Sequence, residues 1–201
     1  MIRFRFLSLG DSYTIGESVA EADRWSVQLA GLLRGKKIDL ENPHIIARTG
    51  WTTAELLSAI EASGNQNQYE LVSLLIGVNN QYRGQPVERY RSEFRQLLQT
   101  ATRFAKNQPN RVVVLSIPDW GASPFGATHD RATIARQIDV FNAIARQECE
   151  QAKVAYVDIT PLTRQATGDA TEFASDGLHY SGKQMKKWAE KVLPVVETRL
   201  H

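Results

Sequence analysis

The chain has 201 residues, of which 24 are Lys or Arg and 22 are Asp or Glu, so its formal net charge is +2. This length favours a single domain over residues 1–201, and the balanced charge argues against a nucleic-acid partner. One cysteine excludes an intramolecular disulfide framework and a thiolate zinc cluster. No apolar stretch approaches the roughly 18 residues that a membrane-spanning helix needs.

In the first ten residues, two arginines interrupt the apolar side chains. This segment lacks the apolar core of about 7–15 residues and the small-residue cleavage site of a signal peptide. We therefore expect a cytoplasmic protein, or a secreted or periplasmic one if a signal was removed from a longer precursor. The segment itself is better interpreted as a first strand.

Five short runs rich in apolar and β-branched residues predict strands that are buried on both faces. These runs are Phe4–Leu9, His44–Ala47, Leu71–Ile76, Val112–Ile117 and Val154–Ile159.

Helical patterns separate the five runs. One begins near Trp25 and stops at Gly35, and a second opens at Thr52, whose spacing to Glu55 is that of a capping box. Further helices are predicted after Pro86, over Ile134–Cys149 and after Ser181, which forms a second candidate capping box with Gln184. Alternation of this kind predicts a three-layer α/β/α fold with a five-stranded, mostly parallel sheet of the flavodoxin-like type.

Polar residues follow each predicted strand. In an open α/β sheet, ligands bind beyond the carboxyl ends of the strands, so these segments are expected to share one edge. They are Gly10–Gly16, Arg48–Trp51, Gly77–Asn80, Pro118–Gly121 and, after a long loop, Ser175–Tyr180. Together they supply a serine, a histidine with an acid three residues before it, an amide side chain and several glycines. Such a set contains the nucleophile, base, orienting acid and oxyanion donors of an acyl-transfer enzyme.

The same segments resemble the SGNH hydrolases, also called the GDSL family of esterases and lipases. The matching blocks, in family order, are Gly10-Asp11-Ser12, Gly50, Gly77-Val78-Asn79 and Asp176-Gly177-Leu178-His179. Two positions depart from the family pattern: Tyr13 stands where the family has leucine, and Asn80 replaces the final acid of the Gly-x-Asn-Asp block. The resemblance covers nearly the whole chain and implies the SGNH type of α/β/α fold.

The resemblance also implies residue roles. Ser12 is expected to attack the carbonyl of a small-molecule ester, and His179 to take its proton, because an unperturbed imidazole titrates near ~6.5. Asp176 would orient the imidazole. The oxyanion donors would be the backbone N–H groups of Ser12 and Gly50 and the side-chain amide of Asn79. Neither a metal nor an organic cofactor is expected.

Each of these residues also has a structural interpretation if it is taken alone. Ser12 and Asn79 are common turn residues, Asp176 could cap a turn, and Gly50 could be needed only for steric reasons. Four aromatic residues flank the motifs and either line an acyl or aryl pocket or serve as packing: Trp51, Trp120, Phe125 and Tyr180.

A second function from a different class is a flavodoxin-like module that binds a phosphate-bearing ligand without hydrolysis. The segment Ser12–Gly16 follows the first strand, where backbone N–H groups can hold a phosphate. However, it lacks a P-loop lysine and the glycine spacing of a dinucleotide fingerprint. This hypothesis also leaves Asp176 and His179 without a role.

Overall fold

Five parallel strands form the centre of the molecule, in a computed structural model that describes residues 3–200. The sheet order is β2-β1-β3-β4-β5, and every neighbouring pair is parallel. The strands are β1 (Phe6–Gly10), β2 (His44–Ala47), β3 (Leu71–Leu75), β4 (Val112–Leu115) and β5 (Ala155–Val157). Each lies within one residue of a predicted run or inside it, so the predicted fold class is confirmed.

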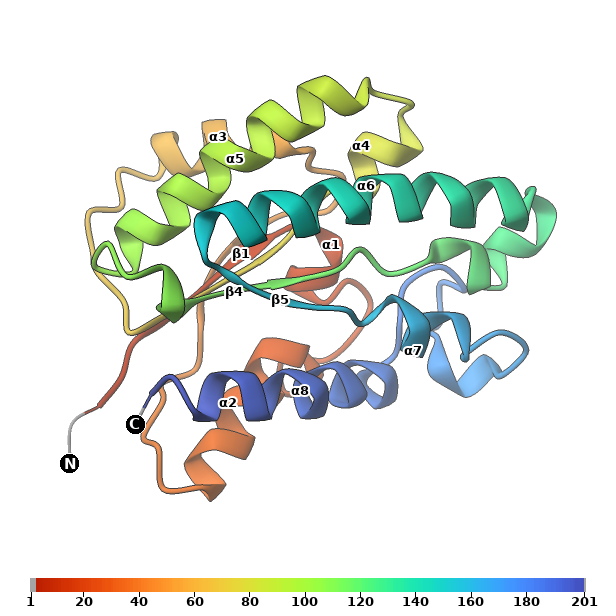
Figure 1. Cartoon of the computed structure of the whole chain (residues 1–201). Helices are drawn as coiled ribbons and strands as arrows, with labels where there is room; N and C mark the ends of the chain where they lie inside the picture. The colour runs from red at the N-terminus through yellow and green to blue at the C-terminus, as the bar shows by residue number, and fades with distance from the viewer. Residues whose placement is uncertain (1–2, 201) are drawn as a thin grey trace.

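Helices cover both faces of the sheet (Figure 1). One face carries α2 (Trp25–Gly35) and α8 (Gly182–Glu197), and the other carries α3 (Thr53–Ala62), α5 (Val87–Phe104) and α6 (Arg131–Ala152). The strands β1, β3 and β4 are therefore buried along their whole length, which explains why their sequences are almost continuously apolar. The two serines in their middle, Ser8 and Ser73, satisfy each other through a 2.8 Å hydrogen bond between their Oγ atoms.

Shorter helical segments occupy the connections. They are α1 (Ser12–Ile15), α4 (Val78–Tyr82) and α7 (Thr160–Arg164), with 3₁₀ turns η1 (Glu21–Asp23), η2 (Pro109–Arg111), η3 (Trp120–Ala122), η4 (Phe125–Thr128) and η5 (Ala170–Glu172). Over residues 3–200, no helix has both the length and the apolar character to cross a bilayer.

The chain turns directly from β1 into α1. A Cβ atom on Gly10 would lie 2.1 Å from Thr14 Oγ1 and 2.4 Å from the carbonyl oxygen of Leu75, so only glycine permits this close approach. Asp11 then caps α1 by accepting a 3.0 Å hydrogen bond from the Tyr13 N–H. As a result, Ser12 becomes the first helical residue at the carboxyl end of a central strand.

The two candidate capping boxes have different outcomes. At α3 the box is complete, because Thr52 accepts from the Glu55 N–H and Glu55 accepts from the Thr52 N–H at 2.8 Å. At α8 only half of it forms: Ser181 accepts from the Gln184 N–H, but the Gln184 amide donates to the carbonyl of Leu162 at 2.9 Å. Gln184 is fully buried against α7, where its amide pairs with the Leu162 carbonyl in place of closing the box.

Candidate active site

A cavity of about 200 Å³ lies at the carboxyl ends of the central strands. Four predicted site residues line it together: Ser12, Gly50, Asn79 and His179. The remaining lining residues are Tyr13, Thr49, Val78, Tyr82, Trp120, Phe125 and Leu178. Segments that are far apart in sequence therefore meet at one site, as expected from the parallel topology.

Asp176 is joined to His179 by a 2.7 Å contact between its Oδ2 atom and the imidazole Nδ1. Its other oxygen, Oδ1, accepts the backbone N–H groups of Leu178 and His179, both at 2.9 Å. Partial burial raises the pKa of Asp176, but the hydrogen bonds to the carboxylate outweigh it and lower the pKa to about 2. The carboxylate is therefore ionised at neutral pH and accepts the Nδ1–H, which leaves Nε2 free to accept a proton.

Ser12 and His179 line the same cavity without a hydrogen bond between Ser12 Oγ and a ring nitrogen in the described part of the chain. Catalytic hydrogen bonds of this kind often tighten only in the complex with substrate. The Tyr13 ring packs beside the imidazole with its centroid at 5.9 Å and an edge-on angle of 66°. Tyr13 is nearly fully buried, and burial raises its pKa well above 10, so this neighbour of the imidazole is neutral.

Two of the predicted oxyanion donors, Gly50 on a loop and Asn79 on α4, lie on segments that are hydrogen-bonded to each other. Gly50 has φ +88°, a conformation that favours glycine, and within residues 3–200 its N–H has no hydrogen-bond acceptor. Its carbonyl accepts a 2.5 Å hydrogen bond from the guanidinium of Arg83. Asn79 donates one amide hydrogen to the carbonyl of Trp51 at 2.9 Å. Because an amide NH₂ has two hydrogens, the second remains for a ligand.

The role of Asn80, which departs from the family pattern, becomes clear from its contacts. Its Oδ1 accepts the Thr53 N–H at 3.1 Å, and its Nδ2 donates to Thr53 Oγ1 at 2.7 Å and to Gln85 Oε1 at 2.9 Å. The Thr53 hydroxyl in turn donates to Glu93. An acid at this position would accept from that hydroxyl, so here Glu93 takes over as the acceptor. Asn80 thus anchors α4 to α3 with all its polar atoms satisfied.

Asp11 is a buried carboxyl directly before Ser12. Burial raises its pKa to about 7, against the opposing effect of the hydrogen bond from the Tyr13 N–H. Its Oδ2 atom is buried and has no hydrogen-bond partner in the structure. The side chain therefore caps α1 through Oδ1 alone.

The four flanking aromatic residues divide into two pairs. Trp120 and Phe125 line the cavity, whereas Trp51 packs against the core and Tyr180 is fully buried, with its hydroxyl donating to the Asp119 carbonyl at 2.6 Å. Sequence reasoning missed Tyr82, which is 57% exposed with its ring 5.3 Å from Trp120. Its only signal was a position three residues after Asn79, one turn along a helix too short to show periodicity.

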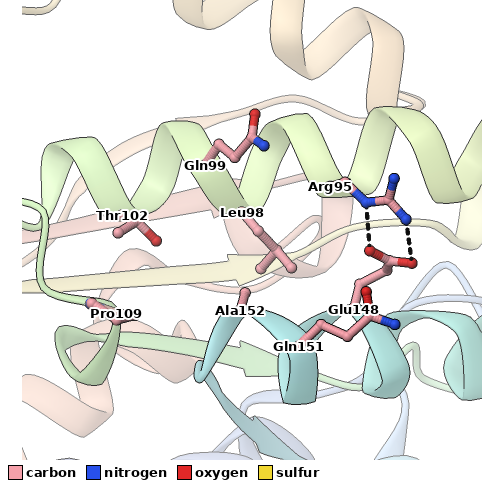
Figure 2. A pocket seen from close by; sticks show the side chains of 8 residues that line it. All are labelled: Arg95, Leu98, Gln99, Thr102, Pro109, Glu148, Gln151 and Ala152. Carbon is pink, nitrogen blue, oxygen red and sulfur yellow. Dashed lines mark hydrogen bonds and ion pairs between the residues drawn. The ribbon is translucent and has the colours of Figure 1, made fainter.

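A larger cavity of about 430 Å³ lies elsewhere, between α5 and α6 (Figure 2). Its main charged group, Glu148, has both oxygens engaged by Arg95 at 2.8 and 3.0 Å and one of them by Arg91 at 2.7 Å. The pKa of Glu148 is lowered, mainly by Arg95. Because this carboxylate is already neutralised and no serine or histidine lines the cavity, the arrangement is a structural ion pair between two helices.

Comparison with solved structures shows the same fold at low sequence identity. The structure of TesA aligns with a TM-score of 0.76 and 18% identity, covering 97% of this chain and 99% of that chain. The psychrotrophic esterase EstA from Pseudoalteromonas sp. aligns with a TM-score of 0.72 and 16% identity, covering 96% of this chain and 97% of that chain. Axe2, an acetylxylan esterase from Geobacillus stearothermophilus, aligns with a TM-score of 0.71 and 17% identity, covering 96% of this chain and 94% of that chain. A search of curated proteins found no match.

Family membership comes from the sequence itself. The model of the GDSL-like lipase/acylhydrolase family matches residues 8–187. This range begins within β1, includes Ser12 near its start and contains the Asp176–His179 segment near its end. It favours the hydrolase hypothesis over the phosphate-binding module, because the match contains the Asp176–His179 segment that the module leaves unused. The chain therefore belongs to the GDSL-like lipase/acylhydrolase family and is a hydrolase that acts on esters.

Proposed function

We propose that this hydrolase cleaves small-molecule esters through an acyl-serine intermediate, with Ser12, His179 and Asp176 as its catalytic triad. The observation that carries the proposal is the shared cavity: Ser12 and His179 open onto it, while Asp176 holds the far side of the imidazole at 2.7 Å. A serine hydroxyl is a weak nucleophile at neutral pH, so it needs a base within the same site.

In the first half-reaction, the Ser12 Oγ–H proton moves to Nε2 of His179 as Oγ bonds to the ester carbonyl carbon. The tetrahedral intermediate collapses when His179 returns that proton to the departing alcohol oxygen, which leaves an acyl group on Ser12. Water then repeats the sequence: His179 takes its proton, the hydroxyl attacks the acyl carbon, and Ser12 Oγ regains a proton as the carboxylic acid departs.

Negative charge on the former carbonyl oxygen would be stabilised by three donors: the N–H groups of Ser12 and Gly50 and the free amide hydrogen of Asn79. The Ser12 N–H belongs to the first residue of α1, where no intrahelical acceptor exists. The Gly50 loop is fixed by Arg83 on its carbonyl side, and Asn79 is fixed by Trp51. Donors held in advance cost no reorganisation when the charge develops.

The cavity supports a preference for esters with short acyl or aryl groups. Its volume of about 200 Å³ lies below the roughly 300–1,000 Å³ of pockets that enclose drug-sized ligands. Its outer wall is aromatic: Trp120 lies 5.3 Å from Tyr82 and 6.0 Å from Phe125, ring centre to ring centre. The first pair is edge-on and the second is tilted, and an aromatic wall of this kind favours flat apolar groups.

The test is turnover of a series of nitrophenyl esters from acetate to laurate by the wild-type protein and by Ser12→Ala. We expect hydrolysis of the short esters and a loss of at least about three orders of magnitude in Ser12→Ala. Ser175→Ala is the matched control, because this exposed serine neighbours Asp176 in sequence and its hydroxyl makes no hydrogen bond to the described residues. Equal rates for Ser12→Ala and Ser175→Ala would contradict the proposal.

A further inference from the structure

The segment that follows α1 has an unusual backbone. The helix ends at Gly16, which has φ +68°, and two residues later Ser18 also has a positive φ, of +62°. A positive φ is uncommon for a residue other than glycine, and it persists only where the surroundings hold the chain in place. Ser18 is exposed, so core packing does not account for it.

A contact across 158 residues of sequence accounts for this conformation. The Ser18 hydroxyl donates to Asp176 Oδ2 at 2.9 Å, and this is the same oxygen that contacts the His179 imidazole at 2.7 Å. The residue before it, Glu17, accepts a hydrogen bond from the hydroxyl of Thr49, which precedes Gly50. The segment therefore connects to the loops on both sides of the cavity.

The Asp176 carboxylate has few other side-chain partners. Its Oδ1 is fixed by two backbone N–H groups, and among the residues of the structure its only ion-pair partner is His179. Among residues 3–200, Ser18 is thus the one side-chain donor to Asp176 besides the imidazole itself. Of the titratable groups near this pair, Tyr13 is buried beside the imidazole ring and Asp11, the residue before Ser12, is buried as well. Within the described range, no lysine or arginine contacts the carboxylate.

We propose that Ser18 is a positioning residue for the catalytic triad: its hydroxyl holds Asp176 Oδ2 in line with the His179 ring, so that the opposite ring nitrogen faces Ser12. This inference rests on the proposed function, since the orientation of Asp176 matters only if His179 acts as the base. Ser18 touches neither substrate nor the reacting atoms and acts through the carboxylate.

Loss of the hydroxyl has two consequences for the pair. The carboxylate is held less firmly, because Oδ2 keeps the imidazole as its only side-chain partner. It is also more basic, because one charge-assisted hydrogen bond is gone, and it therefore stabilises the protonated imidazole more strongly. The looser hold on the carboxylate lowers kcat. Its higher basicity moves the acid limb of the pH profile of kcat/KM to higher pH.

The experiment compares Ser18→Ala and Ser18→Gly with the wild type. Both variants remove the hydroxyl, but glycine adopts a positive φ readily, so Ser18→Gly keeps the backbone relaxed and guards against a folding defect. We expect kcat on a short nitrophenyl ester to fall about three- to tenfold in both variants, with KM unchanged. The midpoint of the acid limb of kcat/KM is expected to move to higher pH, which loss of folded protein alone does not produce.

Two controls separate the outcomes. Ser175→Ala removes an exposed hydroxyl from the residue before Asp176 and is expected to keep the wild-type kcat and pH profile. If Ser18→Ala and Ser18→Gly match this control while Ser12→Ala is inactive, the positioning role is wrong and the triad stands. If Ser12→Ala retains full activity, the proposed function itself fails, whatever the Ser18 variants do.

Discussion

The buried carboxyl of Asp11 provides a quantitative test of the environment around the predicted nucleophile. Its pKa is raised from 3.8 to about 7 by burial. This difference of about 3 pH units corresponds to about 4 kcal/mol of folding free energy, at about 1.36 kcal/mol per unit. Between these two pH values the native protein keeps a proton that the unfolded chain has lost. Raising the pH through this window therefore lowers the free energy of unfolding.

Asp11→Asn removes the ionisable group and keeps the carbonyl oxygen that accepts the Tyr13 N–H. We expect the variant to gain stability relative to the wild type as the pH rises from 4 to 8, by up to about 4 kcal/mol. Urea unfolding of both proteins at pH 4, 6 and 8 measures this difference. The other ionisable groups cancel in the comparison. Asp176 has a lowered pKa of about 2, so its contribution to the free energy of unfolding is lost only below about pH 4. That contribution is therefore constant within this pH window.

An equal difference in unfolding free energy between the two proteins at all three pH values would contradict the raised pKa of Asp11. Such a result would mean that Asp11 ionises in the native protein as it does in the unfolded chain. It would also mean that a charge next to Ser12 is fully compensated by groups other than the Tyr13 N–H.

Three further predictions address the cavity and the core. Asn79→Ala should lower kcat/KM by about 10²–10³ through loss of one oxyanion donor; steady-state kinetics measure this, and a fall of less than threefold would exclude the role. Phe125→Ala opens the aromatic wall, so activity should shift toward esters with longer acyl chains. Val140→Ala, at another exposed apolar residue, should leave this dependence on chain length unchanged. The same dependence in Phe125→Ala as in the wild type would argue against an acyl or aryl site at the aromatic wall. Cys149 is fully buried, and burial raises its pKa to about 12, so a disulfide reagent at pH 8 should modify it only after unfolding, and rapid labelling of native protein would contradict its burial.

The sheet could be predicted because its strands are short and buried on both faces. The run Leu71–Ile76 contains the whole of β3. A strand covered by helices on both sides is a nearly continuous apolar run, which is easy to recognise in a sequence. The end of α2 at Gly35 and the capping box at Thr52 were equally local signals. Such features depend on neighbours within a few residues, which the sequence contains.

Other features depend on tertiary contacts and could not be predicted. The helices α1 and α4 have four and five residues, too few for a helical period to appear. Gln184 has the spacing of a capping box, yet its amide is taken by a carbonyl of α7. Tyr180 stands next to His179 in sequence, but its ring points into the core.

The candidate site was predictable to the extent that parallel topology brings the ends of strands together. The residues Ser12, Gly50, Asn79 and His179 line one cavity, and each follows a predicted strand or the long last loop. By contrast, Ser18 carries no sequence signal. Its link to Asp176 spans 158 positions, and only the folded chain brings the two together.

The most direct test of the account is covalent labelling by a fluorophosphonate, which reacts with an activated serine. Mass spectrometry of the intact protein and of its peptides gives both the number of adducts and their position. We expect one adduct on Ser12, which forms faster at pH 8 than at pH 5 and is absent in Ser12→Ala. An adduct on a different residue, or no adduct on protein that hydrolyses esters, would contradict the account.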